Sequence, residues 1–187
     1  MKYSNTDFNK KNILITGGAG FIGSNLAFYF QTNFPDSNVV IFDCFRNENI
    51  FQNGNLTSFG HYKNLIGFNG DVICGNINKK NDLEILHNYK FDYIFHQAAI
   101  SDTRIYDQEI VMQTNVNSFY EILKIAKKDN AVTIYASSAA VYGSLPSPQQ
   151  IGQEKPENPY GFSKYLMDQM AKKFAIQNSN LKIVGLR

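Results

Sequence analysis

The sequence lacks several features that mark specialised classes of protein. It contains only two cysteines, and no apolar run comes close to the roughly 20 residues that cross a bilayer. We therefore expect no transmembrane span. Cys44 and Cys74 form no C-x-x-C pair and have no cluster of histidines nearby, so the pattern of a zinc site is missing. This predicts buried, unpaired thiols in a reducing compartment, and no metal site.

Charge of one sign is not concentrated anywhere in the chain. The 18 Lys and Arg residues and the 16 Asp and Glu residues are scattered, and the formal net charge is +2. Without a basic arm, nucleic acid is not an expected partner. The first residues, MKYSNTDFNKK, are polar, and 43% of the chain is hydrophobic, which is enough to bury a core. We expect a cytoplasmic protein that does not bind membranes.

Apolar runs alternate with amphipathic ones, as in a parallel sheet wrapped by helices. The pattern predicts strands over residues 12–16, 38–42, 71–75, 91–96, 131–137 and 181–187. It predicts helices over residues 21–33, 80–88, 108–128 and 160–177. The long polar stretch 44–69 interrupts this repeat and is typical of a functional loop. The predicted fold class is α/β, with a Rossmann-type doubly wound parallel sheet.

A glycine-rich turn follows the first predicted strand, in the stretch ILITGGAGFIGSN. Gly17, Gly20 and Gly23 would permit a tight turn, let the backbone approach a pyrophosphate and let the next helix pack closely on the strand. The free N–H groups of that helix would then face the phosphates. Alone, the pattern also fits a simple tight turn. Asp43 ends the second strand, where an acid accepts hydrogen bonds from a ribose, and the combination predicts a dinucleotide site.

Arg46 bears on which dinucleotide binds. It lies just after Asp43, and its guanidinium would pair with a 2′-phosphate. Arginines are also common on surfaces for no such reason. This residue favours NADP as the cofactor and leaves NAD as the alternative.

A second group of residues predicts what the cofactor is used for. Tyr160 and Lys164 share one face of a predicted helix, where a lysine ammonium favours negative charge on the phenol oxygen. Ser138 follows the fifth strand and is placed to bond the same substrate oxygen, with Ser137 as its rival. Tyr and Lys at this spacing also occur by chance on surface helices. Their place beyond the carboxyl end of a strand favours proton transfer beside a nicotinamide.

Five further positions near these groups are also interpreted from the sequence. His96 ends the fourth strand and is interpreted as a structural hydrogen-bonding residue rather than a base. Ser101 and Thr103 follow that strand, and substrate contact and an ordinary polar loop explain them equally well. Asn158 and Pro159 fit the N-cap and the first position of the helix that carries Tyr160.

The motifs GGAGFIG, HQAA, YASSAAVYG and YGFSK resemble those of the extended short-chain dehydrogenase/reductases, the family of NAD-dependent nucleotide-sugar epimerases and dehydratases. The resemblance covers nearly the whole chain. It implies a tightly held NADP, with Tyr160 as a catalytic acid/base, Ser138 in support and Lys164 at the nicotinamide ribose. The other cofactor contacts that it implies are Gly17, Gly20, Phe21, Ile22, Gly23, Asp43, Cys44, Gln97, Ala98, Ala99, Ser101 and Asn115. Asn76 stands where many relatives carry an aspartate toward the adenine, and its amide oxygen is still an acceptor.

Within the family, the segments SNLAF, HYKNLIGF, YIFHQAAISDT and IYASSAAVYG most resemble the heptose epimerases. This implies a homo-oligomeric enzyme that epimerises an ADP-linked heptose at C6 for the lipopolysaccharide core. A UDP-hexose 4-epimerase or a dTDP-hexose dehydratase is the alternative, although Ala139, Ala140 and Val141 stand where a dehydratase usually has acidic residues. A non-catalytic NADP-binding protein is a second alternative, and it would have no need of Tyr160 and Lys164.

Two parts of the family's pattern are not found in the sequence. The heptose epimerases use a second base, a lysine located downstream of the segment that ends here at Arg187. Most of their substrate domain also comes from the C-terminal third. Residues 1–187 are therefore expected to form the NADP-binding domain of a longer epimerase, truncated before most of its substrate domain, and to be inactive alone.

Overall fold

A computed structural model describes residues 5–187, and within them six parallel strands form one sheet in the order β3-β2-β1-β4-β5-β6. The strands are β1 (Asn12–Thr16), β2 (Asn38–Asp43), β3 (Asp71–Cys74), β4 (Tyr93–His96), β5 (Val132–Ala136) and β6 (Ile183–Leu186). The strand order runs outward from β1 in one direction and from β4 in the other. This confirms the predicted Rossmann-type α/β fold and places its switch point between β1 and β4.

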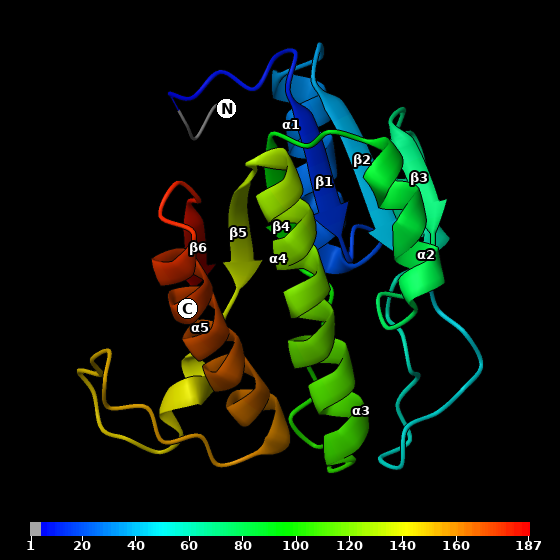
Figure 1. The fold of residues 1–187 in the computed structure, drawn as a ribbon. Coiled ribbons are helices and arrows are strands. Elements are labelled where there is room, and N and C mark those ends of the chain that lie inside the picture. Colours follow the sequence, from blue (N-terminus) through cyan, green and yellow to red (C-terminus); the bar gives the residue numbers. More distant parts are fainter. Residues whose placement is uncertain (1–4) are drawn as a thin grey trace.

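Helices cover both faces of the sheet. Helix α1 (Phe21–Asn33) lies on one face, and α2 (Lys80–Glu84), α4 (Ser118–Asp129) and α5 (Pro159–Gln177) lie on the other (Figure 1). A 3₁₀ turn, Ile85–Asn88, extends α2. The central strand β1 is buried on both sides, with Ile13, Leu14 and Ile15 fully inaccessible. Apolar runs of this kind are what a parallel sheet covered on both faces requires.

The helix predicted over 108–128 is not one regular α-helix. The structure divides it into α3 (Gln108–Met112), a π-helical turn over Gln113–Asn117, and α4. The periodicity of its apolar residues does not reveal the extra residue that such a turn inserts. The turn carries Asn115, whose side chain is fully buried and accepts a hydrogen bond from Ile100 N at 2.8 Å. π-turns often occur at functional sites, and this one joins the helix to the loop after β4.

The long stretch between β2 and β3 folds back toward the carboxyl ends of the strands. It contains a β-bridge between Ile50 and Leu56 and a 3₁₀ turn over Tyr62–Leu65. Phe51 anchors it by packing with Ile100 and Ile105 from the loop after β4. The stretch is therefore held against the same edge of the sheet at which β1 and β4 end.

The prediction of buried cysteines is wrong, because both Cys44 and Cys74 are exposed. Cys74 is the last residue of the edge strand β3, and Cys44 follows the last residue of β2. At these positions the strands leave the sheet, and fewer neighbours cover the side chains. Among residues 5–187, no helix is both long and apolar enough to span a membrane.

Candidate functional site

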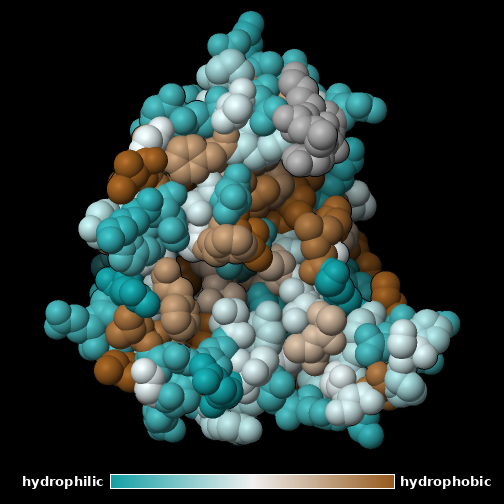
Figure 2. Space-filling model, turned by 180° about the vertical axis from the view of Figure 1, so that it is seen from behind, coloured by the Kyte–Doolittle hydropathy of each residue, from teal (hydrophilic) through white to brown (hydrophobic). Residues whose placement is uncertain are grey.

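A cavity of about 540 Å³ opens at the carboxyl ends of the strands. It is bordered by the glycine turn after β1, the ends of β2 and β3, the loop after β4 and the first turns of α5. Seen from behind, the surface is hollowed near its middle, and hydrophobic side chains gather around the hollow (Figure 2). In doubly wound sheets, ligands bind in the crevice beyond the carboxyl ends of the strands, at the switch point.

The glycine turn is shaped for a close backbone approach. Gly17 has φ of +69°, and a Cβ there would lie 2.7 Å from the backbone nitrogen of Ala98. A Cβ at Gly23 would lie 2.3 Å from the carbonyl oxygen of Gly17. Gly20 is the N-cap of α1 and provides no side-chain hydrogen bond, and the first turn of the helix has no acidic residue. The positive end of the helix dipole is thus left facing the cavity, as an anionic pyrophosphate requires.

We expect Gly23→Ala to weaken both the fold and cofactor binding. The added methyl group would push against backbone atoms of the turn, which cannot move aside as a side chain can. Overpacking of this kind costs about 1–3 kcal/mol. Urea unfolding and titration with NADP would measure the two effects. Asn25→Ala, at an exposed position of the same helix, is the control that should leave cofactor affinity unchanged. An unaltered NADP affinity for Gly23→Ala would show that this turn does not form the phosphate site.

Asp43 is buried at the edge of the cavity, and its carboxylate accepts hydrogen bonds from the glycine turn and from the loop after β2. One oxygen accepts a hydrogen bond from Ala19 N at 2.9 Å, and the other accepts one from Phe45 N at 2.8 Å. Burial raises the pKa of Asp43, and these two amide groups oppose that change. A carboxylate has about four lone-pair sites, so acceptors remain for a ribose. Asp43 therefore fixes the glycine turn against the loop after β2 in addition to its predicted role.

Tyr160 and Lys164 reach the cavity together from α5. Asn158 caps this helix, because its side chain accepts a hydrogen bond from Gly161 N at 2.8 Å, and Pro159 is the first helical residue. Both predictions about the helix start are confirmed. Lys164 Nζ lies 5.8 Å from the centre of the Tyr160 ring. It also donates a hydrogen bond to the carbonyl oxygen of Ala136 at 2.7 Å, and burial lowers its pKa to about 8.

His96, the last residue of β4, is buried and near enough to Lys164 for its charge to act on the imidazole. Its Nδ1 atom is 2.8 Å from Thr16 Oγ1, which agrees with the structural role predicted for it. Thr16 Oγ1 in turn accepts a hydrogen bond from Ala98 N at 3.3 Å. Burial, together with the charge of Lys164, lowers the pKa of His96 to about 3. The imidazole is therefore neutral near pH 7 and ties the ends of β1 and β4 together.

The two serines after β5 have different hydrogen-bonding partners. Ser137 lines the cavity, and its hydroxyl donates a hydrogen bond to Asp168 at 2.9 Å. Ser138 Oγ accepts a hydrogen bond from Ala140 N at 3.1 Å and so caps the short turn Ala139–Tyr142. The hydroxyl hydrogen of Ser138 is not used in that bond.

The structure brings most of the predicted site residues into one cavity wall. These are Gly17, Gly20, Phe21, Ile22, Gly23, Asp43, Cys44, Asn76, Gln97, Ala98, Ala99, Ser101, Tyr160 and Lys164. It does not bring Arg46, Thr103, Asn115 or Ser138 into that wall. Asn115 instead joins two elements, since its side chain donates a hydrogen bond to Ile100 O at 2.9 Å and another to Ser163 Oγ at 2.8 Å.

The long stretch after β2, interpreted from the sequence as a functional loop, forms part of the cavity wall, although the sequence did not single out the residues that do so. Asn47, Phe51, Thr57, Ser58, Phe59 and Gly60 all border the cavity. Asp102 holds this stretch in place by accepting hydrogen bonds from the side chains of Asn53 and Asn55. The Asn-Gly-Asn sequence predicts a turn, but it carries no signal of the distant carboxylate to which that turn binds.

Comparison with known proteins identifies relatives of this chain. The model of the NAD dependent epimerase/dehydratase family matches residues 13–187. An ADP-L-glycero-D-manno-heptose-6-epimerase from Brachyspira hyodysenteriae is 35% identical over 94% of this chain and 53% of that protein. The crystal structure of the Helicobacter pylori enzyme of the same name is 49% identical, with a TM-score of 0.88 over 100% of this chain and 57% of that one. A UDP-glucose 4-epimerase from Brucella ovis in complex with NAD is 28% identical, with a TM-score of 0.76 over 95% of this chain and 51% of that one.

The chain thus spans about half the length of the proteins that it matches. The family match covers the glycine turn, the loop after β4 and the helix that carries Tyr160 and Lys164. These are the elements that border the cavity. The chain belongs to the NAD-dependent epimerase/dehydratase family.

Proposed function

We propose that the full-length protein is a nucleotide-sugar epimerase that interconverts the D-glycero and L-glycero forms of an ADP-linked manno-heptose at C6, in lipopolysaccharide core biosynthesis. The observation that carries the proposal is the placement of Tyr160 and Lys164 in one cavity with the glycine turn. Two relatives, 35% and 49% identical, bear the name of a heptose 6-epimerase, which supports this choice of sugar.

The residues on the cavity wall fit a dinucleotide. Gly17 and Gly23 leave no room for a side chain, and the first turn of α1 presents amide groups toward the cavity without a competing acid. When bound, the nicotinamide supplies hydride transfer to and from the substrate carbon. The part of the chain described here binds and orients the reactants, and it moves the proton of the sugar hydroxyl.

We assign the transfer of the sugar hydroxyl proton to Tyr160. Its phenol lies in the first turn of α5 with the Lys164 ammonium 5.8 Å from its ring centre. Its hydroxyl is thus the group of this pair that can exchange a proton with a sugar hydroxyl. Lys164 itself is held by the carbonyl of Ala136, so it acts as a fixed charge rather than as a mobile base.

Ser138 lies next to the cavity wall, of which Ser137 is a member, and we assign Ser138 rather than Ser137 to hydrogen-bond the reacting oxygen. The Ser137 hydroxyl hydrogen is already given to Asp168, whereas Ser138 only accepts from Ala140 N and keeps its own hydrogen to donate. We expect Ser138→Ala to lower kcat by about 100-fold, as loss of a donor to a reacting oxygen does. Ser137→Ala should lower it less than about tenfold. A larger loss for Ser137→Ala in the same turnover assay would reverse the assignment.

NADP is proposed as the cofactor, with NAD as the alternative. The argument rests on Arg46, which follows β2 close to Asp43 and is exposed, free to meet a 2′-phosphate. A related 4-epimerase of known structure holds NAD, so the family itself does not decide between the two.

Mass spectrometry of the small molecules released from the natively purified full-length protein tests the proposal. We expect a dinucleotide that carries the 2′-phosphate, together with an ADP-linked sugar. Release of NAD instead would contradict the proposed role of Arg46 in binding a 2′-phosphate, and it would not affect the proposal that the protein is an epimerase. Release of a UDP-linked sugar would contradict the heptose assignment and favour a 4-epimerase.

A further inference from the structure

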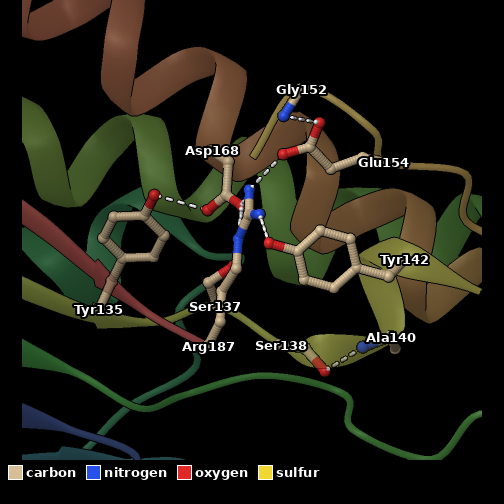
Figure 3. A network of polar contacts seen from close by, with 9 residues as sticks. All are labelled: Tyr135, Ser137, Ser138, Ala140, Tyr142, Gly152, Glu154, Asp168 and Arg187. Atoms are coloured by element: carbon tan, nitrogen blue, oxygen red, sulfur yellow. Dashed lines mark hydrogen bonds and ion pairs between the residues drawn. The ribbon is translucent and has the colours of Figure 1, made fainter. Parts of the chain in front are cut away.

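A largely buried carboxylate that the proposed mechanism does not use is hydrogen-bonded to Ser137. Asp168 is on α5, one turn after Lys164 and two turns after Tyr160, so the three residues share a face of the helix. Its side chain is only 12% exposed. It is the centre of the network in Figure 3, where side chains from β5, from α5 and from the end of β6 point toward one another.

The carboxylate of Asp168 binds two hydroxyl groups at the end of β5. Tyr135 donates to one oxygen at 2.6 Å, and Ser137 donates to the other at 2.9 Å. Residues 135 and 137 alternate along the strand and therefore point to the same face. Between them, the carbonyl oxygen of Ala136 accepts the hydrogen bond from Lys164 at 2.7 Å. Three consecutive residues are thus joined to α5, immediately before Ser138.

Arg187 balances the charge of this carboxylate. Its Nη2 and Nε atoms lie 2.7 Å and 3.1 Å from one oxygen of Asp168. Arg187 also donates to Tyr142 OH and to Glu154 at 2.8 Å, which ties the turn after Ser138 to the same centre. Charge-assisted hydrogen bonds of this kind are stronger and geometrically more specific than neutral ones.

We propose that Asp168 is a positioning residue of the active site, which locks the end of β5 onto α5 and takes the hydroxyl hydrogen of Ser137, so that Ser138 is the serine that keeps its hydrogen to donate. This inference rests on the proposed function. Asp168 does not contact the reacting atoms. It acts through the two serines and through the strand carbonyl that holds Lys164.

The charge of Asp168 also acts on Lys164. Burial lowers the pKa of Lys164, and the nearby carboxylate raises it in partial compensation. The other groups that face the ammonium are His96 from β4, which is neutral near pH 7, and Tyr160 from the same helix. Removal of the negative charge at position 168 therefore lowers the pKa of Lys164 further.

The test compares Asp168→Asn with the unsubstituted full-length protein. Asparagine keeps the size of the side chain and loses its charge. We expect kcat to fall by about 10- to 100-fold, as loss of alignment near a reacting centre does, with KM for an ADP-linked heptose changed less than about twofold. In NMR titrations of isotopically labelled lysine, the pKa of Lys164 should fall. Glu121→Gln, which breaks an exposed ion pair with Lys124, is the matched control and should change neither quantity.

Ser137→Ala provides a second test in case Asp168→Asn does not fold, because it removes one hydrogen bond and no charge. Its smaller loss of kcat should not add to that of Asp168→Asn in the double variant, since both act through the same contact. Full additivity, or an unchanged kcat for Asp168→Asn, would overturn the inference.

Failure of the proposed function would be recognised separately, as an unsubstituted protein that turns over no nucleotide sugar. A crystal structure of Asp168→Asn then decides the inference alone. Displacement of residues 136–138 away from α5 supports the positioning role, and an unmoved turn contradicts it.

Discussion

Tyr160→Phe is expected to lower kcat of the full-length protein by about 10²- to 10⁴-fold, the range that a positioned general acid or base contributes. The substitution removes one oxygen atom from a side chain that borders the cavity at the first turn of α5. Lys164 keeps its hydrogen bond to Ala136, so the wall of the cavity is otherwise retained. We therefore expect NADP affinity and the free energy of unfolding to change little.

The measurement is steady-state turnover of an ADP-linked heptose, with NADP binding followed in parallel. Tyr165→Phe is the matched control. It lies on the same helix and loses the same atom, but Tyr165 stacks on Phe162 rather than bordering the cavity. Near-normal turnover in Tyr160→Phe would remove this residue from the chemistry and with it the main reason to treat the cavity as an epimerase site.

The second large effect is loss of stability in acid, through His96. Burial and the facing Lys164 charge lower its pKa to about 3 in the folded chain, against 6.5 for an ordinary histidine. Between these values the unfolded chain binds a proton that the folded chain does not, so stability is present above pH 6.5 and is lost as the pH falls. At about 1.4 kcal/mol per unit of pKa difference, the loss approaches about 5 kcal/mol near pH 3.

Urea unfolding between pH 7 and pH 4 measures this effect. His96→Phe, which keeps a ring beside Phe119, should be less stable at pH 7 because the bond to Thr16 is lost. Its stability should then fall less steeply with acid than that of the unsubstituted chain. His87→Gln removes an exposed histidine and should leave the slope unchanged. Parallel curves of stability against pH for His96→Phe and the unsubstituted chain would contradict this prediction. They would mean that His96 binds a proton in the folded chain over the same pH range as in the unfolded chain.

Much of the fold could be predicted from the sequence because its signals are local. The glycine turn, the apolar strands and the Asn158-Pro159 helix start each depend on residues close together in the chain. Doubly wound topology then follows from general rules of handedness and alternation. The same local reasoning placed Tyr160 and Lys164 on one helix face, and the structure brings both to the cavity.

The features that the sequence did not predict depend on contacts between distant residues. A Cβ at Gly18 would lie 2.6 Å from the side chain of Ile41 on β2, a contact that the glycine motif itself does not indicate. The π-turn around Asn115 is stabilised by the loop after β4 and by Ser163 on α5. No periodicity within a segment records such partners. The exposure of both cysteines has the same origin, because it depends on where each strand leaves the sheet.

The choice between Ser137 and Ser138 illustrates the same limit within the site. In the sequence the two serines are adjacent and chemically identical. The structure distinguishes them through Asp168, which lies far along the chain and takes the hydrogen of one hydroxyl and leaves the other free to donate. The role proposed for each serine therefore follows from its hydrogen-bond partners rather than from its place in a motif.

Turnover of an ADP-linked D-glycero-manno-heptose by the full-length protein, followed by NMR at C6 of the sugar, tests the central claim most directly. We predict conversion to a mixture of the two C6 epimers without net consumption of NADP, because the hydride taken from the sugar is returned to it. Tyr160→Phe should nearly abolish this conversion. No change at C6 in a folded protein with its dinucleotide bound, or inversion at C4 of a UDP-linked hexose instead, would contradict the account.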